Sequence, residues 1–195
     1  MYHKHHTRGI VLSTKAEGDL HMRVGILTED FGLVYARVGG VRNNSSKLRS
    51  GSQEFAYGDF SLISGKTGWR LVGVRIQTNF FEKLKVFREK AKVMASVSLL
   101  LRKLLFGEEK DQNIFEIVLD FFEFLISAKP EEVAPSECIT VMKVLNILGF
   151  LRSDPEFIEP LALNKLEPAT LSIIASRRAR MINLINESLS ATHVV

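Results

Sequence analysis

The chain has 195 residues, of which 46% are hydrophobic and 25% charged, a balance typical of a globular protein rather than a disordered one. Its 26 Lys and Arg exceed its 22 Asp and Glu, which leaves a modest formal net charge of +4. A single cysteine excludes both an internal disulfide and a zinc site built from cysteines. The length suits one large domain or two small ones.

The N-terminus and the longest apolar stretches predict neither export nor insertion into a membrane. The first residues, Met-Tyr-His-Lys-His-His, lack the apolar core of a signal peptide. Arg102 and Lys103 interrupt one apolar stretch, and three acidic residues between 116 and 123 interrupt another. Neither stretch reaches the roughly 18 apolar residues of a membrane span. We therefore expect a soluble, cytoplasmic protein with no membrane partner.

Apolar and polar residues alternate with period two up to about residue 79, which is the pattern of half-buried strands. The predicted strands lie at 7–15, 21–26, 33–38, 55–64 and 71–76. Eleven of the 13 glycines fall in this part, as expected for the bends of a tightly curled sheet. Five short strands in about 75 residues predict a small closed β-barrel.

From Phe80 onward the apolar residues recur at three- and four-residue steps, the period of an amphipathic helix. The predicted helices run from Phe80 to Gly107, from 112 to 127, from Pro135 to Gly149 and from Pro168 to Leu189. Prolines make the stretch before the last helix irregular. The sequence predicts an α+β protein of two domains, a β-barrel at 1–79 and an all-helical domain at 80–195.

The positive charge is confined to the predicted barrel. Residues 1–78 hold 11 Lys and Arg against 6 Asp and Glu, whereas residues 79–195 hold 15 against 16. A basic face on a small barrel is the electrostatic footprint of a nucleic-acid-binding domain. This asymmetry is the first indication of function.

Cations and aromatic residues are interleaved in the barrel half. The long connection after the third strand, 39–52, carries Arg42, Lys47 and Arg49 among Gly, Asn and Ser. The strands add further arginines and aromatics, namely Arg23, Arg37, Arg70, Arg75, Tyr35, Tyr57 and Trp69. Cations that track a phosphate backbone, beside rings on which bases stack, suit the binding of single strands. The alternative interpretation is a solvated loop with the aromatics turned into the barrel core.

The remaining motifs do not predict catalysis or metal binding. Gly65-Lys66-Thr67 resembles the end of a phosphate-binding loop but lies between two strands, which predicts a hairpin turn. The histidines near the N-terminus have no Asp, Glu or Cys at ligand spacing, and Cys138 is expected to be a small buried side chain. We expect no catalytic residue, metal, cofactor or small-molecule substrate.

The order of several short segments resembles the RecO family of recombination mediators. These segments cover some 50 residues, and each is weak alone. They are His6-Thr7-Arg8-Gly9-Ile10-Val11-Leu12, Gly18-Asp19, Ile26-Leu27-Thr28, Phe31-Gly32, Ala36-Arg37-Val38-Gly39-Gly40-Val41-Arg42, Ser46-Lys47-Leu48-Arg49 and Gln53-Glu54-Phe55. The resemblance is good across residues 1–80 and looser up to about residue 151.

The resemblance implies an OB-fold followed by an all-helical domain. It implies binding of single- and double-stranded DNA, annealing of complementary strands and loading of the recombinase, in DNA repair and recombination at the bacterial nucleoid. The implied partners are RecR and the acidic C-terminal tail of the single-stranded-DNA-binding protein. Many relatives also carry a four-cysteine zinc module, but this chain has only Cys138 and is shorter, so zinc is not expected.

Two hypotheses follow. In the first, the protein is a non-enzymatic DNA-binding mediator, in which Arg37, Arg42, Lys47 and Arg49, with Arg70 and Arg75, contact phosphates, and Tyr35 and Trp69 stack on bases. Arg102 and Lys103, or the cluster Arg177-Arg178-Arg180, would then receive an acidic peptide. In the second, the barrel docks partner proteins and does not bind DNA.

Overall fold

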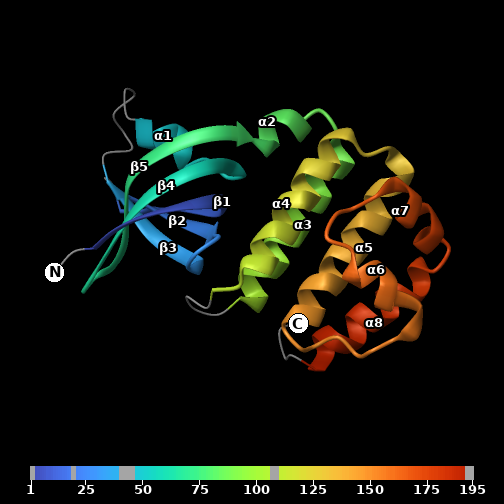
Figure 1. The fold of residues 1–195 in the computed structure, drawn as a ribbon. Coiled ribbons are helices and arrows are strands. Elements are labelled where there is room, and N and C mark those ends of the chain that lie inside the picture. The colour runs from blue at the N-terminus through green and yellow to red at the C-terminus, as the bar shows by residue number, and fades with distance from the viewer. Residues whose placement is uncertain (1–2, 19–20, 40–46, 106–109, 192–195) are drawn as a thin grey trace. The chain divides into compact units, whose positions relative to one another are not determined.

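The fold is that of a computed structural model, which describes residues 3–18, 21–39, 47–105 and 110–191, with Lys47 described in its backbone alone. Five strands come first and a series of helices follows (Figure 1). A short helix, α1 (Lys47–Gly51), lies between the third and fourth strands. The predicted fold class, a five-stranded N-terminal barrel followed by helices, is confirmed.

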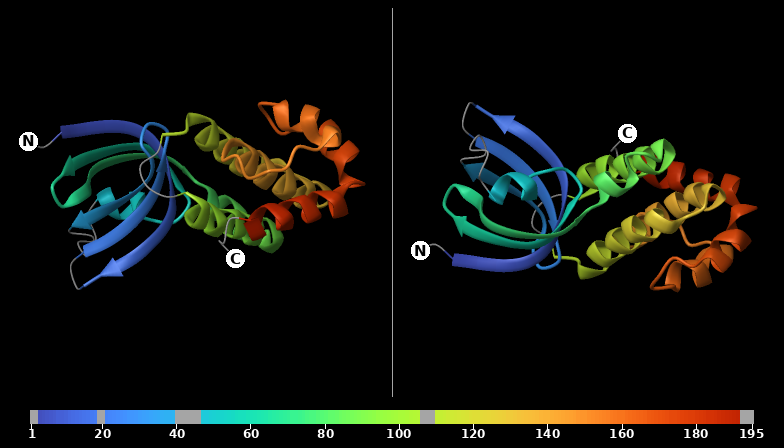
Figure 2. Two further views of the ribbon diagram at one scale, coloured as in Figure 1. Left: turned by 90° about the horizontal axis from the view of Figure 1, so that it is seen from below. Right: turned by 90° about the horizontal axis from the view of Figure 1, so that it is seen from above.

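The strands close into a barrel in the order β1-β2-β3-β5-β4. They are β1 (His3–Glu17), β2 (His21–Thr28), β3 (Gly32–Gly39), β4 (Ala56–Gly65) and β5 (Gly68–Asn79). All neighbours are antiparallel except β3 and β5, which are parallel. The long, curved strand β1 pairs with β4 through its first part and with β2 through its second, and Figure 2 shows it from two sides. A five-stranded barrel of this size is the architecture of an OB-fold.

Strict alternation along β3 separates the barrel core from the outer face. Val34, Ala36 and Val38 are buried, whereas Tyr35 and Arg37 between them are exposed. The inward residues of the other strands join them in one apolar cluster, which α1 covers with its Leu48. Because the apolar side chains of the strands point into the core, the cationic side chains between them lie on the outer face of the barrel.

The helices confirm the expected change of period at residue 80, but several of their limits differ from the prediction. They are α2 (Phe80–Leu84), α3 (Arg88–Leu104), α4 (Gln112–Ser127), α5 (Pro130–Ile147), the 3₁₀ helix η1 (Pro155–Phe157), α6 (Ile158–Ala162), α7 (Pro168–Ala175) and α8 (Arg178–Ala191). The single helix expected from Phe80 is broken between α2 and α3. Val86 and Phe87 at the break are 76% and 51% exposed, so their helical spacing does not reflect a buried face.

The third predicted helix begins five residues earlier than expected, at Pro130 instead of Pro135. Pro130 occupies the first turn, where its missing N–H costs no hydrogen bond, and the Glu132 carboxylate accepts the backbone N–H of Lys129 at 2.7 Å. Pro135 lies one turn further on, inside the helix. Similarly, the last predicted helix is divided into α7 and α8 by a turn at residues 176–177.

Two compact units make up the chain. The first consists of residues 1–86 and 98–115, and the second of residues 87–97 and 116–195. The helices α3 and α4 therefore each contribute to both units. The domain boundary expected at residue 79 stays a prediction.

The second unit has its own core, in which α5 packs against α7 and α8. Two polar side chains fix the irregular segment between these helices. Lys143, which is 5% exposed, donates from Nζ to the carbonyl of Leu163 at 2.6 Å, and the Asp120 carboxylate accepts the backbone N–H of Leu166 at 2.8 Å. Burial raises the pKa of Asp120 and lowers the pKa of Lys143. These two partly buried polar contacts connect the irregular segment to α4 and α5.

Among the described residues, none of the helices combines the length and the apolar character that crossing a membrane requires.

Candidate nucleic-acid interface

Four cationic side chains lie in one register row across four strands of the barrel. Lys15 of β1 pairs with Arg23 of β2, which in turn pairs with Arg37 of β3. Arg37 also pairs with Arg70 of β5 across the parallel ladder. All four residues are exposed, and partners in register project from the same face of a sheet. Like charges opposite one another destabilise a sheet, so this row, here called the cation row, favours an anionic ligand.

The carboxylate of Glu17 pairs with two arginines of the cation row. Arg23 Nη2 donates to Glu17 Oε1 at 2.9 Å, and Arg37 Nε lies 3.4 Å from Glu17 Oε2. Oε2 is buried and accepts no hydrogen bond from the described part of the chain. Glu17 thus neutralises one of four positive charges and leaves the row with a positive excess.

Two further register rows flank the cation row on the same face. On one side Gly25 pairs with Tyr35, and on the other His21 pairs with Gly39. The Nδ1 atom of His21 is buried and has no hydrogen-bond partner among the described residues. The outer face of β2 and β3 therefore presents a ring, two guanidinium groups and an imidazole in succession.

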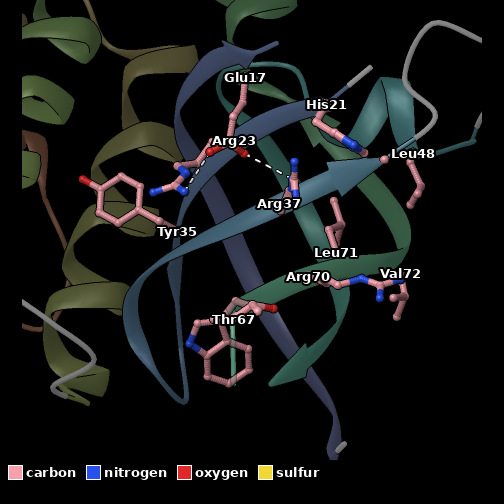
Figure 3. A pocket seen from close by; sticks show the side chains of 13 residues that line it. Glu17, His21, Arg23, Tyr35, Arg37, Leu48, Thr67, Arg70, Leu71 and Val72 are labelled. Atoms are coloured by element: carbon pink, nitrogen blue, oxygen red, sulfur yellow. Dashed lines mark hydrogen bonds and ion pairs between the residues drawn. The ribbon is translucent and has the colours of Figure 1, made fainter. Parts of the chain in front are cut away.

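A hollow of about 910 Å³ opens over these rows. In Figure 3 its side chains come from the end of β1, from β2 and β3, from the start of β5 and from α1. Its residues are Glu17, His21, Arg23, Tyr35, Arg37, Gly39, Leu48, Thr67, Gly68, Trp69, Arg70, Leu71 and Val72. Three arginines against one glutamate make it a positively charged pocket, here called the barrel pocket.

The two aromatic residues of the barrel pocket differ in exposure. Tyr35 is 45% exposed, whereas Trp69 is 8% exposed and belongs to the barrel core. Trp69 packs against Phe31 and His5, with ring centroids 5.1 and 5.4 Å apart. Tyr35 consequently offers a ring surface to a ligand, and Trp69 forms part of the pocket wall.

The structure brings together only some of the residues that the sequence singled out. Arg37, Arg70, Tyr35 and Trp69 line the barrel pocket. Arg75 does not line it, and both its Nε and Nη2 donate to Asp59 Oδ2, at 3.0 and 2.8 Å. This bond from Arg75 holds the pKa of Asp59 below its usual value.

The connection between β3 and β4 is described only in part. Arg49 lies exposed on α1, next to Leu48 of the barrel pocket. Arg42 and the side chain of Lys47 lie outside the described residues. Their assignment as phosphate contacts stays a prediction.

Lys15 and Glu17 were not among the candidate residues chosen from the sequence, and Arg23 was noted only as an exposed arginine. A local signal could have found them, because a turn signal in the sequence separates the two strands, and a short connection that pairs Glu17 with His21 also places Lys15 opposite Arg23. The fourth member of the row, Arg70, comes from a parallel pairing between strands distant in the sequence.

Two arginines of the basic cluster at the start of α8, Arg177 and Arg180, form hydrogen bonds within their own unit. Arg180 donates to Asp154 Oδ2 from Nε at 2.9 Å and from Nη2 at 2.7 Å, and this interaction lowers the pKa of Asp154. Arg177 donates to the carbonyl of Glu156 at 3.2 Å. Arg102 and Lys103, by contrast, lie exposed on α3.

The hairpin turn and the buried cysteine agree with the prediction from the sequence. Gly65 and Gly68 pair at the end of the β4–β5 hairpin, so the Gly65-Lys66-Thr67 segment is a turn. Cys138 is 6% exposed, and burial raises the pKa of its thiol. Within the described residues, no three His, Cys, Asp or Glu side chains are grouped so as to hold a metal ion.

Comparison with known proteins shows which family and which relatives this chain resembles. Residues 1–75 match the family described as "Recombination protein O N terminal". Relatives named DNA repair protein RecO come from Bacillus pumilus and Bacillus velezensis, each 30% identical, over 146 and 144 residues. These alignments cover 73% and 72% of this chain, and 55% and 54% of the relatives. A third, from Gloeothece citriformis, is 28% identical over 145 residues, 72% of this chain and 50% of the relative.

The chain therefore spans about half the length of the curated relatives that it matches. The family match covers the part of the chain that forms β1 to β4 and most of β5, and it includes every residue of the barrel pocket. The N-terminal family and the names of the relatives agree with one another and with the barrel fold, so the barrel region of this chain, residues 1–75, belongs to the N-terminal domain family of RecO.

Proposed function

We propose that this protein binds DNA through the barrel pocket and acts as a recombination mediator in DNA repair. The observation that carries the proposal is the cation row, in which Lys15, Arg23, Arg37 and Arg70 lie side by side and, within the described part of the chain, only Glu17 is paired with them. A polyanion resolves the repulsion within such a row, and phosphate contacts of this kind supply most of the affinity of sequence-independent DNA binding.

The dimensions of the row support a strand running across the barrel strands. Neighbouring strands lie about 4.8 Å apart, so four cations in register span about 14 Å, the length of a short run of phosphates. Arg49, with Arg42 and Lys47 of the same connection, would extend the contacts beyond α1. Binding of single and of double strands is then mainly electrostatic.

Annealing follows from the same electrostatics. Two complementary strands repel one another through their phosphates, and a protein that neutralises some of these charges lowers the cost of their approach. No bond is made or broken in this step, so the protein acts without catalytic residues. Helping to load the recombinase onto DNA would be the further activity of a mediator.

We propose the helical region as the part that docks partner proteins. The partners implied by the family resemblance are RecR and the acidic tail of the single-stranded-DNA-binding protein, at the nucleoid in the cytoplasm. Arg102 and Lys103 are the better candidates for an acidic peptide, since Arg177 and Arg180 already bind groups of their own unit. Titration of a labelled acidic peptide against R102A/K103A and R177A/R180A variants would distinguish these sites.

The DNA-binding proposal is tested by the affinity for a labelled single strand as a function of salt concentration. Each phosphate neutralised on a single strand contributes about −0.7 to the slope of log K against log salt. We expect the R37A/R70A variant to bind more weakly and with a slope less steep by about 1.4. Arg75→Ala is the matched control, because Arg75 belongs to the same barrel but is paired with Asp59 outside the pocket.

A salt-independent affinity, or an R37A/R70A variant that binds as the wild type does, would contradict the proposal. Either result would favour the second hypothesis, in which the barrel docks proteins and does not bind DNA. An equal loss on Arg75→Ala would show that binding is not centred on the barrel pocket.

A further inference from the structure

A glycine lies opposite the exposed tyrosine of the barrel pocket. Gly25 of β2 pairs in register with Tyr35 of β3. A Cβ atom on Gly25 would lie 3.0 Å from Cε1 and 3.4 Å from Cδ1 of the Tyr35 ring. The ring therefore lies over the place that any larger side chain on β2 would fill. Gly25 is needed here because of this close approach.

The neighbouring strand β1 also restricts the space beside the Tyr35 ring. Ser13 of β1 pairs with Gly25, and its Oγ would lie 2.6 Å from the same Cβ position. A Cβ at Gly25 would thus have to displace both Ser13 and Tyr35. The two neighbours confine the space above Gly25 from both sides, while Tyr35 itself remains 45% exposed.

The seated ring lies next to the cation row. Tyr35 is two residues from Arg37 on β3, and Gly25 is two residues from Arg23 on β2, so both pairs share one face. Two residues along a strand correspond to about 7 Å. A nucleotide whose phosphate contacts Arg23 or Arg37 can therefore bring its base to the ring.

We propose that Tyr35, seated over Gly25, is a stacking platform for one unpaired nucleobase, and that Gly25 is the residue that positions it. This inference rests on the proposed function, because the cation row has to hold the phosphates. A base inside a duplex is covered on both faces by its neighbours and is paired at its edge, so it cannot stack on the ring without leaving the helix. The platform consequently gives the barrel pocket a preference for single strands over duplexes.

The test compares two ligands that have the same phosphates and differ in their bases. One is a fluorescein-labelled oligothymidylate, and the other is an abasic strand of equal length. Stacking on an aromatic ring accounts for roughly a 5- to 150-fold change in affinity per base. We expect Tyr35→Leu to lose roughly this factor on the oligothymidylate and to leave the abasic strand unaffected, whereas Tyr35→Phe, which keeps the ring, binds both as the wild type does.

The positioning role of Gly25 is tested in a background that removes the other close contact. Ser13→Ala takes away the hydroxyl at 2.6 Å, so that S13A/G25A differs from S13A mainly in the displaced Tyr35 ring. We expect S13A/G25A to lose affinity for the oligothymidylate but not for the abasic strand. Gly73→Ala is the control, because its Cβ would also approach a serine, at 3.3 Å from Ser61 Cβ, but Gly73 does not line the barrel pocket.

The outcomes separate the two proposals. If the wild-type protein binds neither strand, the proposed function fails and the platform fails with it. If the wild-type protein binds both strands and Tyr35→Leu weakens both equally, or weakens neither, the platform is wrong and the phosphate-binding function stands. Circular dichroism and the fluorescence of Trp69, the one tryptophan of the sequence, verify that each variant is folded.

Discussion

The carboxylate of Glu17 accepts a 2.9 Å hydrogen bond from Arg23, and both residues line the barrel pocket. The same carboxylate lies 3.4 Å from Arg37. Both arginine side chains remain more than half exposed, so a phosphate can reach them. Glu17 is thus an internal anion at the place where we propose that DNA binds.

We expect Glu17→Gln to strengthen DNA binding. Loss of the carboxylate releases Arg23 and Arg37, and an exposed ion pair of this kind corresponds to about a 2- to 5-fold change in affinity. Fluorescence anisotropy with a labelled single strand measures the effect. Glu82→Gln is the control, since it removes the same charge from α2, where Glu82 pairs with Lys85. Weaker binding by Glu17→Gln would show instead that the carboxylate positions the two arginines for DNA.

The pair Arg8–Glu29 predicts part of the acid sensitivity of the barrel. Arg8 donates from Nε at 2.8 Å and from Nη2 at 2.7 Å to the two oxygens of Glu29. The hydrogen bond from Arg8 holds the pKa of Glu29 below its ordinary value of 4.5. Because the folded-state pKa is the lower one, the pair stabilises the fold above about pH 4.5, and this contribution is lost as the pH falls through the folded-state pKa.

We therefore expect Glu29→Gln to lose less stability on acidification than the wild type. The free energy of unfolding in urea, measured at pH 7, 4.5 and 3, gives the comparison. Glu123→Gln on the exposed face of α4 should retain the wild-type pH dependence. An unchanged acid response in Glu29→Gln would mean that the pair does not couple folding to pH.

Gly58 is a position where the barrel cannot accept a side chain. A Cβ there would lie 2.2 Å from the carbonyl oxygen of Arg75 and 2.9 Å from Cα of Ile76, and both atoms belong to the backbone of β5. Backbone atoms of a paired strand cannot move aside cheaply, so Gly58→Ala should lower the free energy of unfolding by about 1–3 kcal/mol or more. Gly39→Ala should cost much less in the same urea titration, and equal costs would contradict this explanation.

Lys143 should hold the segment before α7 in place. Its buried Nζ donates to the carbonyl of Leu163 at 2.6 Å. Lys143→Met leaves that carbonyl without its partner, which should cost about 1–3 kcal/mol and speed the exchange of amide hydrogens around residues 163–166. Lys165→Met, at an exposed position of the same segment, is the control. Unchanged exchange in Lys143→Met would show that other contacts determine the path of the segment.

Local patterns in the sequence predicted much of this protein. Period-two alternation is a property of each strand by itself, so it identified the five strands and the outward direction of Arg37. The change to helical spacing at residue 80 and the turn at 65–68 are also local. The resemblance to the RecO family depended on short segments in order, and the family match and the relatives confirm it.

Other features depend on contacts between distant residues. The parallel pairing of β3 with β5 adds Arg70 to the cation row, and no local pattern sets this register. Burial separated the two aromatic candidates, because Trp69 fits the barrel core and Tyr35 lies over Gly25 on the outer face. The sequence by itself thus determined which strands carry cations and the family that the barrel region resembles. Only the tertiary structure decided which cations meet, because register between distant strands is selected by the packing of the whole barrel.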